Sequence, residues 1–161
     1  SGRFITTEAW WESLQKTYQL RGVAFEATAL DAGILLPKDL FDSASENLLQ
    51  NALEKRKVDP NVEVTVSIAC GDEIVLRVCD SGRPVSRNVL QGLLRGPVPS
   101  DTGYGIGLYQ VARQAEMSGF NFRLAGNEPG QGCFELRGEV RRGGPALRAG
   151  PRTAAQESAA T

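Results

Sequence analysis

Histidine is missing from all 161 residues of this chain. Its absence excludes Ser-His-Asp and Cys-His catalysis, and it also excludes any metal site built on histidine. The sequence lacks an apolar run long enough to span a bilayer, and it lacks a signal peptide. We therefore expect a soluble domain that makes no membrane contact of its own.

Cysteine is scarce, and neither sign of charge dominates. Cys70, Cys79 and Cys133 are scattered and form no CxxC pair, which favours reduced, partly buried thiols in a cytosolic domain. The net charge is −1, and no basic stripe precedes the C-terminal tail. Nucleic acid is therefore not the expected partner.

The chain does contain enough apolar material for one core, since 41% of its residues are hydrophobic and 23% are charged. From residue 141 onward the sequence consists mainly of Arg, Gly, Pro, Ala and Ser, with little apolar bulk. We expect a disordered tail over residues 141–161. The structured domain is then expected at residues 1–140.

Periodicity and turn-forming residues predict a mixture of helices and strands. An N-cap at Thr7 predicts a helix over residues 8–20, and a second helix is expected over about 37–57. Residues 86–102 contain Gly and Pro with little periodicity and are expected to form a loop. Strands are expected over residues 23–30, 62–68, 74–79, 120–124 and 133–137.

The most informative segment is GYGIGL, which runs from Gly103 to Leu108. It opens an amphipathic helix, and glycines at every second position leave the backbone at the helix N-terminus bare of side chains. Such an end carries unpaired N–H groups and about half a positive elementary charge, so phosphate is a natural ligand there. A plain turn into a helix is the alternative interpretation of this segment taken alone.

Two asparagines, Asn47 and Asn51, are four residues apart and share one face of the second predicted helix. They lie beside its apolar stripe, where amides need hydrogen-bond partners or a ligand. An amide oxygen is a suitable ligand for a hard cation such as Mg²⁺. The alternative interpretation is a pair of ordinary capping or bridging asparagines.

Asp80 shares the parity of Ile74, Leu76 and Val78, so it lies on the apolar side of its strand where the strand ends. A carboxylate in that place is costly unless it is paired. Gly82, two residues later, lets a flat ligand approach the backbone. The carboxylate could accept the exocyclic amine of adenine, or it could cap the following turn.

Taken in order, four segments resemble the ATP-binding domain of sensor histidine kinases, in the superfamily shared with gyrase, the large heat-shock chaperone and mismatch-repair ATPases. ENLLQNAL at 46–53 resembles the N box, CDSGRPV at 79–85 the first glycine box, GYGIGL the second, and GQGCFEL at 130–136 the third. The resemblance covers roughly residues 4–140. It implies an α+β fold, a two-layer α/β sandwich in which a mixed sheet of about five strands packs against three helices, with a lid loop over ATP.

The resemblance also implies a role for individual residues. Asn51, with help from Asn47, would hold the Mg²⁺ that bridges the phosphates of ATP. Asp80 would bind the adenine amine, with Gly82 beside it and Val85 against the ring. The second glycine box completes the implied ATP-binding set with Gly103, Gly105, Ile106, Gly107 and Leu108.

Three features depart from the family pattern. Pro84 replaces the last glycine of the first box and removes an N–H donor. Glu54-Lys55-Arg56 follows the N box where the family carries a basic residue and an aromatic, so Lys55 or Arg56 is expected to reach a phosphate from an unusual position. The expected lid, residues 86–102, is short and contains no phenylalanine.

The family transfers the γ-phosphoryl group of ATP to a histidine on a separate helical dimerisation domain, which passes it to a response regulator. Because this chain has no histidine, the resemblance implies that it holds Mg-ATP while the acceptor lies elsewhere in a parent kinase. Positioning and charge neutralisation dominate phosphoryl transfer, and no catalytic side chain is assigned here. The implied location is the cytoplasm, with a parent protein that can be anchored in the inner membrane.

Other classes of protein remain as alternatives at this point. A non-catalytic module that senses ATP is favoured by Pro84 and the unusual lid. An anti-sigma-type serine kinase shares the fold but usually carries a glutamate where Asn47 stands. A dinucleotide-binding oxidoreductase is disfavoured because its glycine motif follows a strand directly, and a P-loop NTPase is excluded because the sequence has no Gly-Lys pair.

Overall fold

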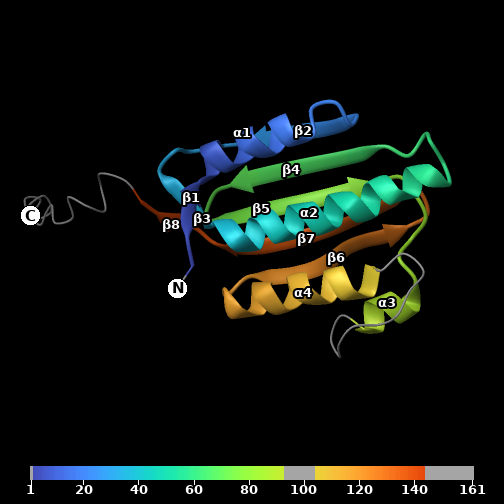
Figure 1. Cartoon of the computed structure of the whole chain (residues 1–161). Helices are drawn as coiled ribbons and strands as arrows, with labels where there is room; N and C mark the ends of the chain where they lie inside the picture. Colours follow the sequence, from blue (N-terminus) through green and yellow to red (C-terminus); the bar gives the residue numbers. More distant parts are fainter. Residues whose placement is uncertain (1, 93–103, 144–161) are drawn as a thin grey trace, which may run out of the picture.

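A computed structural model describes residues 2–92 and 104–143 of the chain. Its architecture has two layers, a sheet and a set of helices on one face of that sheet (Figure 1). Gly103, most of the expected lid at 93–102, and residues 144–161 lie outside the described residues. Within the described part, no helix combines the length and the apolar character that a bilayer crossing requires.

The main sheet has five strands in the order β2-β4-β5-β7-β6. β2 runs parallel to β4, and the other neighbouring pairs are antiparallel, so the sheet is mixed as expected. Alternation in the sequence dictates its two faces: Val64, Val66 and Ile68 are buried toward the helices. The strands span β2 (Val23–Thr28), β4 (Val64–Cys70), β5 (Glu73–Asp80), β6 (Asn121–Glu128) and β7 (Gln131–Glu139).

Three helices cover the sheet: α1 (Thr7–Thr17), α2 (Lys38–Glu54) and α4 (Tyr104–Met117). A short 3₁₀ turn, η1 (Lys55–Lys57), extends α2. The N-cap expected at Thr7 is wrong by one residue. The Thr6 hydroxyl accepts a hydrogen bond from the backbone N–H of Ala9, whereas Thr7 is buried and donates to the Asp31 carbonyl.

The core lies between the sheet and α2, the helix that crosses its centre (Figure 1). Phe41 on α2 is fully buried and meets Trp10 of α1 and Phe120 edge-on, with ring centroids 5.3 Å and 5.6 Å apart. This packing fixes α1 and α2 against each other and holds α2 in one position over the sheet. The other large, fully buried side chains include Leu36, Leu48, Leu49, Ile68, Ile74, Leu76, Leu108 and Leu136.

A second, small sheet was not expected from the sequence. It has the order β1-β3-β8 and consists of β1 (Phe4–Thr6), β3 (Ile34–Pro37) and β8 (Arg141–Arg142). The domain boundary expected at residue 140 is therefore early, because β8 pairs with β3. The loop expected from residue 86 also begins differently, since α3 (Arg87–Gly92) is helical.

The open face of the main sheet carries a buried carboxylate. Glu135 is 1% exposed and is surrounded by Arg77, Arg123 and Arg137, whose nitrogens lie 2.7, 3.0 and 3.2 Å from its oxygens. Burial raises the pKa of Glu135, but hydrogen bonds from the three arginines outweigh burial and lower that pKa to about 2. This cluster joins β5, β6 and β7 across their solvent side.

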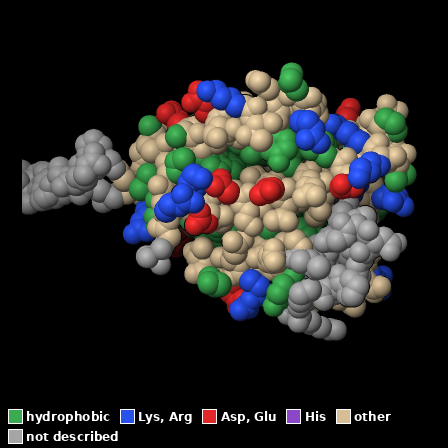
Figure 2. Space-filling view, viewed as in Figure 1, with side chains coloured by type: hydrophobic (Ala, Val, Ile, Leu, Met, Phe, Trp, Pro, Cys, Tyr) green, Lys and Arg blue, Asp and Glu red, His purple; other side chains and the backbone are tan. Residues whose placement is uncertain are grey.

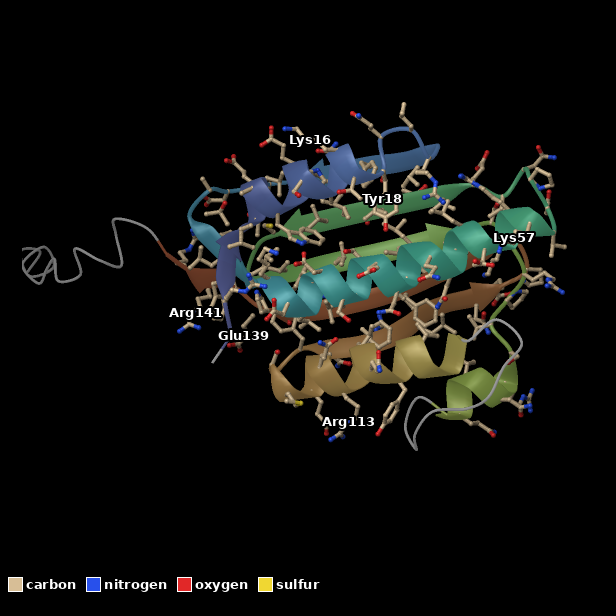
Figure 3. All side chains as sticks on the ribbon, in the orientation of Figure 1. Lys16, Tyr18, Lys57, Arg113, Glu139 and Arg141 are labelled. Carbon is tan, nitrogen blue, oxygen red and sulfur yellow. A yellow bond between two sulfur atoms is a disulfide. The ribbon has the colours of Figure 1, made fainter. Side chains whose placement is uncertain are left out.

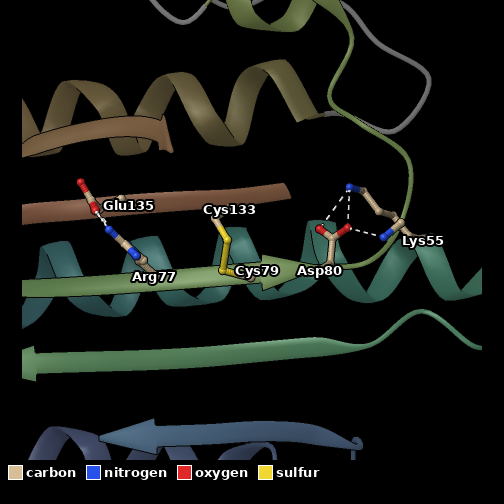
Figure 4. Close-up of a disulfide and its surroundings, with 7 residues drawn as sticks. Lys55, Arg77, Cys79, Asp80, Cys133 and Glu135 are labelled. Atoms are coloured by element: carbon tan, nitrogen blue, oxygen red, sulfur yellow. Dashed lines mark hydrogen bonds and ion pairs between the residues drawn. A yellow bond between two sulfur atoms is a disulfide. The ribbon is translucent and has the colours of Figure 1, made fainter. Parts of the chain in front are cut away.

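The expectation of three reduced thiols is wrong for two of the cysteines. Cys79 on β5 and Cys133 on β7 are register partners with Cα atoms 4.1 Å apart, and they form a disulfide (Figure 4). The sequence could not reveal this pairing, because 54 residues separate the two cysteines and only the strand register brings them together. Cys70 keeps its thiol, and burial raises the pKa of that thiol.

Candidate functional site

The C-terminal end of β5 presents the carboxylate that the sequence singles out. Asp80 lies on the helix-facing side of the sheet, as its parity predicts, and its side chain is only 12% exposed. Its Oδ1 accepts a hydrogen bond from the backbone N–H of Gly82 at 2.8 Å. Asp80 therefore caps the turn that follows β5, which was one of its two possible roles.

Lys55, at the C-terminal end of α2, is the principal partner of this carboxylate. Its ammonium nitrogen lies 2.9 Å and 3.1 Å from the two oxygens of Asp80 and 2.7 Å from the carbonyl oxygen of Arg83 (Figure 4). The Lys55 side chain is 13% exposed, so most of the pair is shielded from water. In this structure the ammonium is placed on the predicted adenine-binding residue rather than on a phosphate site.

The Lys55 side chain also fills the space beside Gly82. A Cβ built on Gly82 would lie 2.7 Å from Cδ of Lys55 and 3.2 Å from Oδ1 of Asp80. Glycine leaves space above its backbone, as predicted, but in this structure the methylenes of Lys55 fill that space.

Arg56, the other cation expected near phosphate, has a structural role here. Its guanidinium donates to the carbonyl oxygens of Arg21, Gly22 and Val62 at 2.5, 2.8 and 2.9 Å. These bonds tie the end of α2 to the start of β2 and the segment before β4. Lys55 is therefore the cation of this pair that lies at the predicted nucleotide site.

Asn127 on β6 is a site residue that sequence reasoning missed. Its side-chain amide accepts from the Val85 N–H at 2.8 Å and donates to the Val85 carbonyl at 3.2 Å. The Gly130 N–H also donates to the Gly82 carbonyl at 3.3 Å. The first and third glycine boxes are thus joined directly, and Val85 is held with its side chain buried. No local signal marks Asn127, because its partner lies 42 residues away.

The N box and the second glycine box also meet. Asn47 donates through Nδ2 to the Ser43 carbonyl at 2.8 Å, and its Oδ1 faces Gly107 on α4. A Cβ on Gly107 would lie 2.5 Å from this oxygen, so any side chain at residue 107 would require the Asn47 amide to move. Leu108, the next residue, is fully buried. Gly105 and Ile106 lie in the first turn of α4, as predicted.

The side-chain amides that α2 carries near Gly107 fit a magnesium ion. The Asn47 amide oxygen faces α4, and Asn51 lies one turn further along the same helix. Amide oxygens are ligands that Mg²⁺ accepts alongside phosphate oxygens and waters. Across the described residues no group of three or more Asp, Glu, Cys or His side chains could hold a metal ion.

The structure brings the predicted residues together in two groups joined by α2. Asp80, Gly82 and Lys55 lie at its C-terminal end, and Asn47 lies with Gly107 two turns earlier, about 12 Å along the axis at 1.5 Å per residue. A separate cavity of about 1220 Å³ is lined by Phe4, Tyr109 and Phe120 among others, and none of the described site residues lines it. That cavity is not the predicted site.

These features define a two-layer α/β fold with a polar site between two of its helices and the end of a central strand. A sequence model of the family described as "Histidine kinase-, DNA gyrase B-, and HSP90-like ATPase" matches residues 38–140, and the chain belongs to this family. The family expected from the four boxes is thereby confirmed. A search of the curated proteins finds none that matches the chain.

Several solved structures of histidine kinases share this fold. The catalytic domain of histidine kinase ThkA aligns with 86% of this chain and 95% of its own, at TM-score 0.66 and 15% identity. Mycobacterial sensor histidine kinase MprB aligns with 87% of this chain and 99% of its own, at TM-score 0.64 and 17% identity. Full-length ShkA in complex with AMPPNP gives a TM-score of 0.73 at 17% identity, covering 94% of this chain and 34% of ShkA.

Proposed function

We propose that this domain binds Mg-ATP and donates its γ-phosphoryl group to a histidine on a separate dimerisation domain, as part of two-component signalling. The observation that supports this best is the arrangement along α2. At the C-terminal end of the helix Lys55 contacts the carboxylate of Asp80. Two turns earlier, Asn47 faces Gly107 near the start of α4. An extended ligand with a flat base and an anionic tail suits that arrangement.

Each end of the site would have its own task. Asp80 would accept the adenine amine, and the buried Val85 would pack near the ring. The backbone N–H groups at the start of α4 would bind phosphate oxygens through Gly105, Gly107 and Leu108. Asn51 and Asn47 would hold Mg²⁺, which neutralises phosphate charge when it is bound.

The acceptor must come from another domain, because this chain has no histidine. The proposed partner is a histidine-bearing dimerisation domain of the parent kinase, which would pass the phosphoryl group to a response regulator. The proposed location is the cytoplasm. Within this chain the contribution to catalysis is positioning of the nucleotide, which is the larger part of phosphoryl transfer.

Binding is the first step to test. Calorimetry should give a dissociation constant for ATP and ADP in the presence of Mg²⁺ of roughly 10⁻⁶–10⁻³ M. The melting temperature should rise with nucleotide concentration, since a ligand that binds the folded state stabilises it. No heat and no thermal shift up to millimolar nucleotide would contradict the proposal.

Transfer is the second step. The domain would be mixed with radiolabelled ATP, Mg²⁺ and a separately supplied dimerisation domain, with a variant of that domain lacking its histidine as control. Label on the intact partner alone is the expected result. Binding without transfer would favour a non-catalytic module that senses ATP, an alternative supported by the placement of Lys55 on Asp80.

A further inference from the structure

Lys55 and a bound adenine would compete for one place. The ammonium nitrogen lies within 3.1 Å of both oxygens of Asp80, and the Lys55 methylenes fill the space at Gly82, where an added Cβ would meet Cδ at 2.7 Å. A flat base that hydrogen-bonds Asp80 and lies against the Gly82 backbone needs that same volume. The base and the lysine therefore cannot both be there.

From this overlap we infer that Lys55 is an internal competitor for the nucleobase, which holds the Asp80 site closed and sets its affinity for adenine compounds. The inference rests on the proposed function, because it treats Asp80 as the base-binding residue. Base binding then requires that Lys55 break its bonds to Asp80 and to the Arg83 carbonyl, which lies 2.7 Å from the ammonium. The released ammonium becomes available to the phosphates, the role that the sequence predicts for it.

The surroundings of the pair make the closed arrangement stable. Both side chains are nearly nine-tenths buried, so screening by salt is weaker than at an exposed pair. The Gly82 N–H holds Asp80 at 2.8 Å, and the Asn127 amide fixes the following Val85 backbone. The carboxylate therefore keeps its place while the lysine, at the end of a flexible chain, is the group that moves.

Adenosine is the probe that isolates this effect, because it has the base but neither phosphate nor net charge. Its affinity would be measured by calorimetry for the parent domain and for Lys55→Ala and Lys55→Met. Lys57→Ala is the matched control, since Lys57 lies near the same end of α2 but is 75% exposed and pairs with Glu54 (Figure 3). Lys55→Met keeps the aliphatic stem if the alanine variant does not fold.

Lys55→Ala should bind adenosine about tenfold more tightly than the parent. Lys55→Met loses the ion pair but keeps a stem beside Gly82, so its gain should be smaller, and Lys57→Ala should bind adenosine like the parent. The gain should be smaller for ADP, because the variants also lose a cation near the phosphates. Adenosine affinity equal to or lower than that of the parent would overturn the inference, provided that ADP still binds. If the parent binds no ADP at all, the proposed function fails, and the inference fails with it.

Discussion

The amide oxygen of Asn47 lies 2.5 Å from the point at which a Cβ on Gly107 would stand. The second glycine box therefore has a packing role besides its predicted role toward phosphate. Helix α4 is held against α2 through a contact that any larger residue would disturb. This relationship also explains why a glycine is tolerated inside a helix, where it is normally unfavourable.

Replacing this glycine tests the packing role. Alanine normally stabilises a helix by about 1 kcal/mol relative to glycine. We expect Gly107→Ala to show no such gain, because overpacking costs about 1–3 kcal/mol. Urea unfolding measures the difference, with Gly71→Ala as control, since nothing lies within 4 Å of a Cβ there. A gain of a full kcal/mol in Gly107→Ala would show that the contact is unimportant.

Asp80→Asn should weaken the binding of adenine compounds. The amide loses a charged acceptor, which corresponds to about 1.5–3 kcal/mol. The cost should appear fully in the Lys55→Ala background, where no lysine competes, and should be smaller in the parent. Calorimetry with adenosine measures both. Asp72→Asn, on the exposed β4–β5 turn, is the control. Equal adenosine affinity in Lys55→Ala and in a folded Lys55→Ala, Asp80→Asn double variant would disprove the assignment.

Asn51→Ala should remove the dependence of ADP binding on Mg²⁺. Its amide oxygen is the proposed ligand, and alanine keeps the helix while removing that oxygen. ADP affinity would be measured with Mg²⁺ and with a chelator. Gln50→Ala removes an exposed amide from the adjacent position of α2 and should leave the dependence intact. An unchanged response to Mg²⁺ in the Asn51 variant would exclude it as the ligand.

Reduction of the Cys79–Cys133 disulfide should destabilise the domain. The bond closes a long loop whose ends are 54 positions apart in the sequence, and such crosslinks contribute about 2–4 kcal/mol. Dithiothreitol should lower the urea midpoint of the parent but not that of the Cys79→Ser, Cys133→Ser double variant. A midpoint in the parent that is insensitive to reductant would mean that the crosslink contributes nothing.

Glu135 should make stability fall in acid. Its pKa is lowered to about 2 in the folded state, from about 4.5 unfolded, so its contribution is complete above pH 5 and is lost as the pH falls toward 2. That contribution is about 3 kcal/mol. The stability difference between the parent and Glu135→Gln should shrink by this amount between pH 5 and pH 2. Glu12→Gln, which replaces an exposed carboxylate on α1, is the control.

The main sheet and the helix after the glycine run could be predicted because their signals are local. Val64, Val66 and Ile68 alternate with polar residues, and the parity of Asp80 follows from the same rule. The small sheet could not be predicted in this way. Its strands β1, β3 and β8 are short, and nothing in three or four residues shows a period.

The site was predictable in its residue types but not in its pairings. Asn47, Asp80 and Gly107 were singled out from spacing and resemblance, and in the structure Asp80 contacts Lys55 while Asn47 lies beside Gly107. The partners of these residues depend on tertiary structure. Lys55 is 25 residues from Asp80 in the sequence, and Asn127 is 42 residues from Val85. These pairs meet only because of how α2 packs on the sheet and where β6 lies within it.

The small sheet has a practical consequence for handling the protein. β1 and β8 both pair with β3, at the end of the domain remote from the C-terminal end of β5 (Figure 1). On the helix-covered face between these ends, basic and acidic side chains lie interspersed (Figure 2). A fluorophore or surface tether attached at Phe4 or at Gly143 would therefore stand clear of Asp80 and its loop. The same label on the Pro129–Gly130 turn would lie close to Gly82, whose carbonyl accepts a hydrogen bond from the Gly130 N–H.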